Sequence, residues 1–182
     1  MNFFTHILSP LGGITLAGDE KALTGLWFDG QKYFPEQLSG EEREAPVFRK
    51  VSDWLDQYFA GKNPATEIPI HVCGSQFRRD VWGILQQIPY GTTTTYGQIA
   101  KQLAARTGKN VSAQAVGGAV GHNPVSLIIP CHRVVGSDGS LTGYAGGLEK
   151  KYALLKLEGA DAGILPIHET RSHSKNGDLQ MK

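Results

Sequence analysis

The sequence predicts two units of different class, an N-terminal α/β domain with a small antiparallel sheet (residues 1–73) and a C-terminal helical domain (residues 74–160). Short apolar runs broken by Gly and Pro open the chain, as is typical of a strand meander. The second unit instead has apolar residues at helical spacing, with two short helices joined by a turn that contains Gly108. Residues 161–182 are mostly polar and aperiodic, so we expect a disordered tail.

In the N-terminal unit, three apolar runs predict strands and one apolar stripe predicts a helix. The runs are separated by turn residues and cover positions 3–8, 14–17 and 23–28. The stripe follows Pro46, a favoured first-turn residue, and ends before Gly61. We expect this helix to cover one face of the sheet. Residues 62–75 contain two prolines and a glycine, and they predict a linker.

In the C-terminal unit, apolar stripes predict four helices. They lie over residues 77–88, around 99–104 after a threonine cap region at 92–95, over 112–121 and over 148–158. Residues 127–130 predict a short buried strand or extended run, and the glycine-rich residues 134–147 predict a loop or a hairpin wing. The two middle helices fit an ordinary helical hairpin as well as a helix-turn-helix.

Composition excludes several classes of protein. The chain has 182 residues, 40% hydrophobic and 19% charged, which is the make-up of a globular protein. No apolar run approaches the roughly 18 residues that span a bilayer, and the first residues lack a signal-peptide pattern. We therefore expect a cytoplasmic protein with no membrane partner. Cys73 and Cys131 are too few for a disulfide framework or a four-thiolate zinc site.

The two units differ in charge. Residues 1–73 hold six Lys and Arg against ten Asp and Glu, whereas residues 74–160 hold nine against four. The first unit is therefore acidic and the second basic, although the whole chain has a formal net charge of +1. This split favours a polyanionic partner for the second unit, but charge alone makes nucleic-acid binding only an even choice.

Cys131 is a possible nucleophile because His132 and Arg133 follow it directly. A thiol with an ordinary pKa of about 8.5 is only about 3% thiolate at pH 7, so a nucleophilic cysteine needs a cation, a base or a helix N-terminus nearby. Neighbours on an extended chain point to opposite sides, so His132 serves Cys131 only if Pro130 introduces a turn. From this dipeptide alone, a buried structural cysteine beside a surface histidine is the simpler interpretation.

The longer pattern around Cys131 is far more specific. The chain reads Asn-Pro-Val-Ser-Leu-Ile-Ile-Pro-Cys-His-Arg-Val at 123–134, Thr-Gly-Tyr-Ala-Gly-Gly-Leu at 142–148 and Lys-Leu-Glu-Gly at 156–159. This pattern resembles the O6-alkylguanine-DNA alkyltransferases, which are direct-reversal DNA repair proteins. The resemblance covers residues 77–159 closely and the N-terminal unit in outline. It implies an N-terminal α/β domain and a C-terminal winged helix-turn-helix domain that carries the DNA contacts and the reactive thiol.

The resemblance implies catalytic roles for five residues. Cys131 matches the alkyl acceptor, His132 the base that takes the thiol proton through a bound water, and Glu158 the carboxylate that orients the histidine. Tyr96 matches a tyrosine that offers its phenol proton to the guanine, and Asn123 matches a hinge between the recognition helix and the active-site strand. Without the family, Glu158 fits a solvated helix end, Tyr96 fits packing and Asn123 fits a turn.

The resemblance also implies a set of residues that bind DNA and the flipped base. Residues 112–121 match a recognition helix whose small side chains press into the minor groove, although a tightly buried helix would look the same. The set comprises Gln114, Ala115, Gly117, Gly118, Arg133, Val134, Tyr144 and Ala145. Within it, main-chain atoms near Val134 and Ala145 match contacts to the flipped base, and Tyr144 matches a wall of the alkyl pocket.

Two features depart from the family pattern. Gln114 stands where relatives usually carry an arginine that fills the space left by the flipped base, so this cationic plug is lost unless His122 or Lys109 replaces it. Some relatives bind zinc through two cysteines and two histidines in the N-terminal domain, where this chain has one cysteine and two histidines. We therefore expect neither a structural metal nor another cofactor.

The implied function is repair of double-stranded DNA that contains O6-alkylguanine. The resemblance implies a monomer, located at the nucleoid or nucleus when bound to DNA, that binds the minor groove and flips the damaged base. It then transfers the alkyl group irreversibly to Cys131. O4-alkylthymine is a second substrate that reacts less efficiently. A damage-binding or regulatory winged-helix protein that does not repair is one alternative, and a thiol hydrolase is another. Non-repairing relatives replace the acceptor cysteine, whereas this chain keeps Cys131, His132 and Glu158 together.

Overall fold

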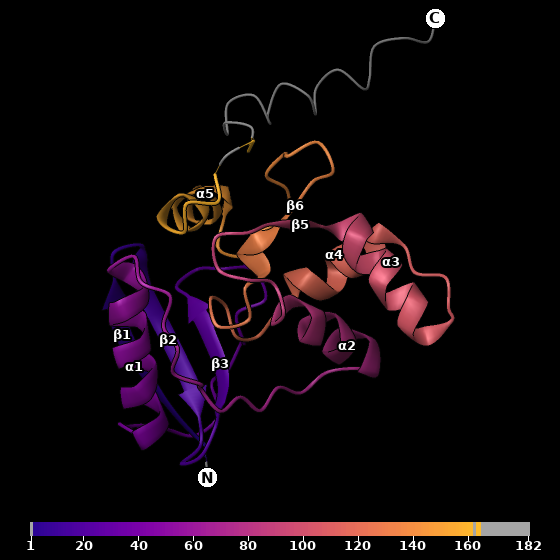
Figure 1. Cartoon of the computed structure of the whole chain (residues 1–182). Helices are drawn as coiled ribbons and strands as arrows, with labels where there is room; N and C mark the ends of the chain where they lie inside the picture. Colours follow the sequence, from indigo (N-terminus) through magenta and orange to yellow (C-terminus); the bar gives the residue numbers. More distant parts are fainter. Residues whose placement is uncertain (1, 162, 165–182) are drawn as a thin grey trace, which may run out of the picture.

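The N-terminal half of the computed structural model is a sheet covered by one helix (Figure 1), and the structure describes residues 2–161 and 163–164. Strands β1 (Phe3–Ser9), β2 (Gly12–Gly18) and β3 (Leu23–Phe28) form the predicted antiparallel meander. The short β4 (Glu41–Glu42) pairs with β1 in parallel, which makes the sheet mixed rather than purely antiparallel. Two exposed glutamates carry no apolar alternation, so no pattern indicated this strand.

Helix α1 (Pro46–Phe59) packs on β1 and β2, as the apolar stripe predicted. Pro46 stands in its first turn, where a missing N–H leaves no hydrogen bond unmade. The buried face of α1 ends at Tyr58, whose hydroxyl hydrogen-bonds to Glu158 in the C-terminal half.

The C-terminal half contains the four predicted helices, α2 (Gln76–Leu85), α3 (Tyr96–Thr107), α4 (Ala113–Gly121) and α5 (Leu148–Leu157). Thr95 and Gln98 form a reciprocal capping box at the start of α3, and Gly108 ends that helix with φ of 68°. Ser112 caps α4 through the backbone N–H of Ala115. Contacts among α2, α3 and α4 hold these three helices together.

In the C-terminal half, one expected element differs from the prediction and a second, for which two structures were predicted, takes one of them. Residues 127–130 are turns rather than a strand, and Leu127 has φ of 69°, which breaks any extended run. Val134–Val135 (β6) pairs in parallel with Thr94–Thr95 (β5), and residues 136–147 form a loop, which is one of the two structures predicted for this region. The apolar composition of residues 127–130 and the glycine-rich composition of residues 134–147 are each compatible with several local structures, and contacts with distant segments determine which one forms.

The two halves share one hydrophobic core rather than being joined by a free linker. The N–H of Leu26 in β3 donates to the carbonyl of Pro124, and the N–H of Ser126 donates to the carbonyl of Leu26. Residues 69–71, within the predicted linker, hydrogen-bond to Leu23 of the same strand. The edge of the sheet therefore positions the chain that leads to Cys131. Within the described part of the chain, no helix is long and apolar enough to cross a membrane. Most of the predicted tail at 161–182 lies outside the described residues.

Candidate active site

Cys131 begins a short 3-10 helix, η1 (Cys131–Arg133), directly after Pro130. The turn that would place His132 beside the cysteine is therefore present. The thiol is 3% exposed, and its Sγ accepts a hydrogen bond of 3.1 Å from Nδ2 of Asn123. Burial raises the pKa of Cys131, while the Asn123 bond and the positive charge of Lys151 oppose the rise. The resting thiol is thus protonated at neutral pH and requires a base before it can attack.

Asn123 fixes the position of the sulfur relative to α4. It follows the helix directly, and its buried side chain donates to the carbonyls of Ile129 (2.8 Å) and Val125 (3.3 Å) as well as to the sulfur. Its Oδ1 accepts from the N–H of Val125 over 3.0 Å. One amide therefore ties the end of the helix to the turn that carries Cys131.

The carboxylate of Glu158, at the end of α5, collects donors from several segments. His132 Nε2 lies 2.7 Å from Oε1, the hydroxyl of Tyr58 donates to Oε1 over 2.6 Å, and Arg133 Nε donates to Oε2 over 2.8 Å. The backbone N–H of Gly91 adds a bond of 3.2 Å to Oε2. Burial by itself would raise the pKa of Glu158, but the bonds from His132, Arg133 and Tyr58 hold it well below its usual range. Glu158 is therefore ionised and fully hydrogen-bonded.

His132 is neutral, and its surroundings determine its tautomer. Burial lowers the pKa of His132, although the adjacent Glu158 opposes this. Because Nε2 faces an ionised carboxylate oxygen, this nitrogen carries the proton and donates it to Glu158. The buried Nδ1 then holds the lone pair and has no hydrogen-bond partner among the described residues. Nδ1 is the atom that can accept a proton.

Arg133 occupies a different place from the one expected of a DNA-binding residue. Its guanidinium makes two bonds to Glu158 and one of 2.6 Å to the carbonyl of Ile88, and the residue is buried. These contacts turn the charge toward the interior and leave it neutralised by Glu158. The structure therefore brings Arg133 into the Glu158 cluster and not onto the surface of α4.

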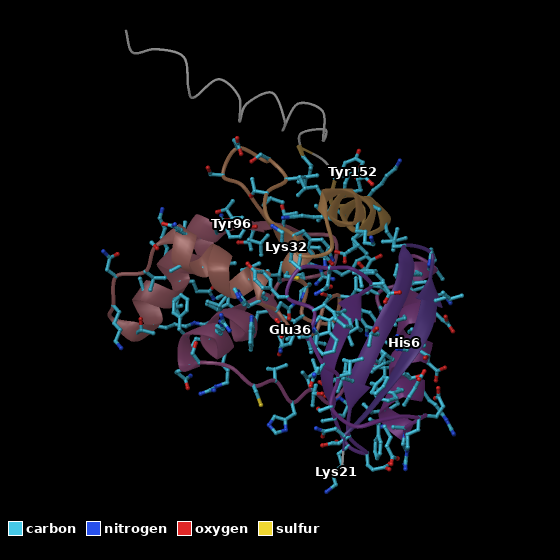
Figure 2. All side chains as sticks on the ribbon, turned by 180° about the vertical axis from the view of Figure 1, so that it is seen from behind. His6, Lys21, Lys32, Glu36, Tyr96 and Tyr152 are labelled. Atoms are coloured by element: carbon cyan, nitrogen blue, oxygen red, sulfur yellow. The ribbon has the colours of Figure 1, made fainter. Side chains whose placement is uncertain are left out.

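The loop over the site is held from three directions. The hydroxyl of Tyr96 donates to the carbonyls of Thr142 (2.8 Å) and Gly143 (3.2 Å), and Lys151 Nζ donates to Thr142 (2.7 Å) and to Val134 (2.5 Å). The N–H of Lys32, in the N-terminal half, donates to the carbonyl of Ala145, so this half also holds the loop; Lys32 and Tyr96 are both labelled in Figure 2. Tyr144, between these anchors, is buried.

Helix α4 presents one buried face and one exposed face. Val116, Ala119 and Val120 pack inward, and Trp82 Nε1 donates to the carbonyl of Ala119. The outer positions are Gln114, Ala115, Gly118 and the partly exposed Gly117. A Cβ added at Gly117 would lie 3.8 Å from the ring of Tyr96, so the exposed face adjoins the site. The alternative of a wholly buried helix does not hold.

Comparison with known proteins agrees with this geometry. Residues 76–160 match the family described as 6-O-methylguanine DNA methyltransferase, DNA binding domain, and residues 2–72 match its ribonuclease-like domain. The chain belongs to the 6-O-methylguanine DNA methyltransferase family. The resemblance seen in the sequence is thereby confirmed.

Members of the methyltransferase family align over most of their length. The methylated-DNA–protein-cysteine methyltransferase of Mycolicibacterium paratuberculosis is 45% identical over 150 residues, covering 82% of this chain and 88% of the relative. That of Methanosarcina acetivorans is 45% identical over 159 residues, covering 87% and 99%. The crystal structure of Mycobacterium tuberculosis OGT in complex with DNA superposes with a TM-score of 0.77 at 39% identity, covering 92% of this chain and 98% of that one.

Two residues of this methyltransferase site escaped the sequence interpretation. Lys151 lies three residues after Leu148 and four before Leu155, so a charged residue on the apolar stripe of a helix was the available signal. Burial lowers its pKa to about 8, which keeps the ammonium form accessible beside Cys131. Tyr58 also lay on an apolar stripe, where a tyrosine fits ordinary packing, and no local signal distinguished it.

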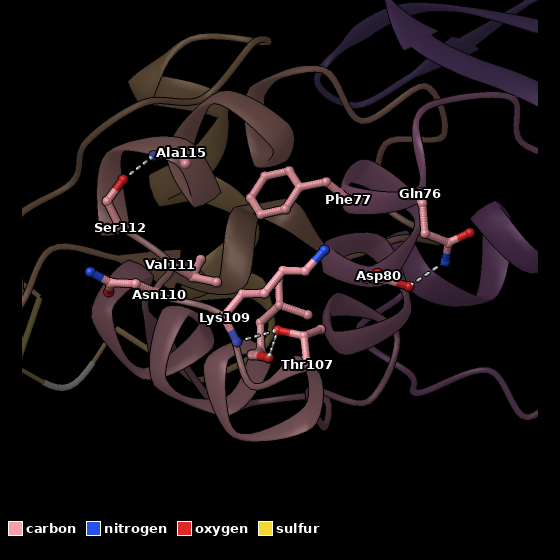
Figure 3. A pocket seen from close by; sticks show the side chains of 10 residues that line it. Gln76, Phe77, Asp80, Thr107, Lys109, Asn110, Val111, Ser112 and Ala115 are labelled. Carbon is pink, nitrogen blue, oxygen red and sulfur yellow. Dashed lines mark hydrogen bonds between the residues drawn. The ribbon is translucent and has the colours of Figure 1, made fainter.

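One pocket of the methyltransferase lies away from the thiol, between α2, α3 and the start of α4 (Figure 3). It has a volume of about 410 Å³, with Phe77, Leu103 and Val111 among its apolar lining residues. Of the residues expected to bind DNA, it includes only Ala115. None of the residues that surround Cys131 line it, so we assign the chemistry to the thiol site and not to this pocket.

Proposed function

We propose that this protein repairs DNA by direct reversal, taking an alkyl group from O6 of guanine onto Sγ of Cys131. The observation that carries the proposal is the buried Cys131 sulfur, held by Asn123 and followed by a neutral His132 whose Nδ1 is unpartnered among the described residues. The His132–Glu158 pair, with N–O distance 2.7 Å, supplies an oriented base. Family membership supports the assignment.

The transfer exchanges one bond for another. A water molecule carries the Cys131 proton to Nδ1 of His132, the resulting thiolate attacks the alkyl carbon, and the bond between this carbon and O6 breaks. The guanine leaves as an anion and takes the phenol proton of Tyr96, and the proton held by the His132 imidazolium returns through solvent to the Tyr96 oxygen, so both side chains end neutral. Lys151 stabilises the thiolate through its positive charge, and its carbonyl contacts hold the loop at 142–143. The product is a stable thioether, so each molecule acts once and needs no cofactor.

DNA binding is assigned to the C-terminal half. We assign residues 1–73 to one domain and residues 74–160 to a winged helix-turn-helix domain. In the second domain, α3 and α4 form the helix-turn-helix. Residues 134–147 take the place of the wing. The exposed small residues of α4 fit a minor groove, and the alkylated base leaves the duplex to reach Cys131. Val134, Tyr144 and Ala145 receive it. O4-alkylthymine is a poorer substrate, and the protein acts as a cytoplasmic monomer.

Intact-protein mass spectrometry after incubation with duplex DNA containing O6-methylguanine tests the proposal. One methyl group per protein is expected, mapping to Cys131, with loss of the adduct in Cys131→Ser. Cys73→Ser is the matched control, because Cys73 is exposed and lies outside the site. Repeated turnover, an adduct on Cys73, or damage-specific binding without any adduct would contradict the proposal, and the last result would instead identify a non-repairing binding protein.

A further inference from the structure

Tyr58 reaches the catalytic cluster from the opposite half of the molecule. It lies in the last turn of α1, it is fully buried, and its hydroxyl donates to Glu158 Oε1 over 2.6 Å. The hydroxyl oxygen of Tyr58 also lies 3.3 Å from Nε2 of His132. The ring stacks on Trp54, with centroids 5.1 Å apart and planes 9° apart, and this fixes its direction.

The hydroxyl of Tyr58 is a permanent hydrogen-bond donor. Burial raises the pKa of Tyr58, and the negative charge of Glu158 raises it further, so the phenol stays protonated. With its proton committed to Glu158, the phenol oxygen offers only lone pairs to His132. Both neighbours of Nε2 are then acceptors, and this favours the tautomer in which Nδ1 is free to act as a base.

We propose that Tyr58 is a positioning residue for alkyl transfer, through which the N-terminal half holds Glu158 and His132 in the reactive arrangement. This inference rests on the proposed function and assigns the N-terminal half a part in the chemistry. Tyr58 touches neither the thiol nor, in this proposal, the substrate. It acts by fixing one oxygen of Glu158 and by moderating how strongly that oxygen attracts the proton of His132.

Four other ionisable groups share this environment and define the controls. Arg133 binds both oxygens of Glu158, Lys151 opposes protonation of His132, and Cys131 precedes the histidine. Tyr90 packs against Tyr58 at a centroid distance of 6.1 Å, and its own hydroxyl donates to the carbonyl of Leu157 over 3.4 Å. Only the hydroxyl of Tyr58 contacts both Glu158 and His132 among these tyrosine groups.

Tyr58→Phe tests the proposal because it removes this hydroxyl and keeps the ring. A hydrogen bond to a charged group contributes about 1.5–3 kcal/mol, so transfer from free O6-benzylguanine should slow about 10- to 100-fold. Tyr90→Phe is the control, since it removes a neighbouring phenol hydroxyl that donates to the carbonyl of Leu157 and, among the described residues, makes no hydrogen bond to Glu158 or His132; its rate should stay within about twofold. If Tyr58→Phe reacts as fast as wild type, or if Tyr90→Phe slows transfer equally, the Tyr58 hydroxyl has no particular role and the proposal is wrong.

Two further measurements separate positioning from simple stabilisation. In a Glu158→Gln background, Tyr58→Phe should have little further effect on the rate, because the two residues act through one interaction. NMR titration of the His132 ring in the full chain should show its pKa raised in Tyr58→Phe, since Glu158 loses a competing donor and stabilises the imidazolium more strongly. Additive rate effects, or an unchanged His132 titration, would overturn the proposal. The titration requires no substrate, so it remains decisive even if wild type forms no Cys131 adduct and the proposed function fails.

Discussion

The ammonium of Lys151 and the phenol of Tyr96 donate to the same atom, the carbonyl oxygen of Thr142, over 2.7 and 2.8 Å. Helices α5 and α3 thus hold the loop beside the thiol through one shared acceptor. The loop makes no strand pairing after Val135, so these side-chain bonds hold it together with backbone bonds such as that from Lys32 to Ala145. The following predictions test this arrangement and the cluster around Cys131.

Lys151→Met should destabilise the protein and change its pH dependence. It leaves the carbonyls of Thr142 and Val134 without their buried donor, at a cost of about 2–3 kcal/mol in the free energy of unfolding. The folded-state pKa of about 8 lies below the ordinary 10.5, so the unfolded chain binds more protons between these values. Stability attributable to Lys151 therefore rises with pH in that window. Denaturant unfolding at several pH values in a Cys131→Ser background should show this rise only with Lys151 present.

Tyr96→Phe should slow transfer about 10²- to 10⁴-fold if the phenol supplies the proton to guanine. The loss should be equal on free base and on duplex DNA, because the proton is needed in both reactions. Single-turnover kinetics measure both rates. Tyr90→Phe removes a hydroxyl bound only to the carbonyl of Leu157 among the hydrogen bonds found for it, and it should react normally. A wild-type rate for Tyr96→Phe would rule out this role.

Asn123→Ala should raise the pKa of the Cys131 thiol, because Nδ2 is a donor that favours the thiolate. The pH profile for alkylation should shift to higher pH, and transfer at pH 7 should fall at least about tenfold, as expected for a charge-assisted bond of 1.5–3 kcal/mol. Titration of the thiolate ultraviolet absorbance gives the pKa directly. An unchanged profile with reduced stability would make Asn123 structural only.

Glu158→Gln should change both the rate and the acid stability. Glu158 has a folded-state pKa below its ordinary value of 4.5, so its contribution to stability is present above pH 4.5 and is lost as pH falls toward the folded value. The variant lacks this contribution at neutral pH, and its unfolding free energy should fall less between pH 5 and 3. Transfer should slow about 10²-fold or more. If the free energy of unfolding falls by the same amount between pH 5 and 3 in wild type and in Glu158→Gln, the proposed link between Glu158 ionisation and stability is wrong.

Gln114→Arg should speed repair of duplex DNA and strengthen its binding, with a steeper salt dependence, because a cationic side chain replaces an exposed glutamine on α4. Reaction with the free alkylated base needs no flipping and should stay within about twofold. Gln57→Arg adds the same charge on the exposed side of α1 and should alter neither reaction. Equal changes on duplex and free base would mean that Gln114 does not occupy the gap left by the base.

Local sequence patterns were enough to predict the helices and the meander, and they singled out Cys131 as the proposed nucleophile. Periodic apolar stripes and caps such as Thr95 act over a few residues, so they can be predicted without knowing the rest of the fold. The motif around Cys131 was specific because its residue types recur together along one stretch.

Which groups surround Cys131, His132 and Glu158 depends on how distant segments of the chain pack together. The Arg133 side chain lies in the interior because it hydrogen-bonds to the buried carboxylate of Glu158. Lys151 is buried because its ammonium donates to the carbonyls of Val134 and Thr142. Tyr58 lies 100 positions from Glu158 and meets it only because the sheet edge and α1 bring the halves together. Hydrogen bonds between distant segments depend on how those segments pack, and no local pattern in the chain encodes that packing.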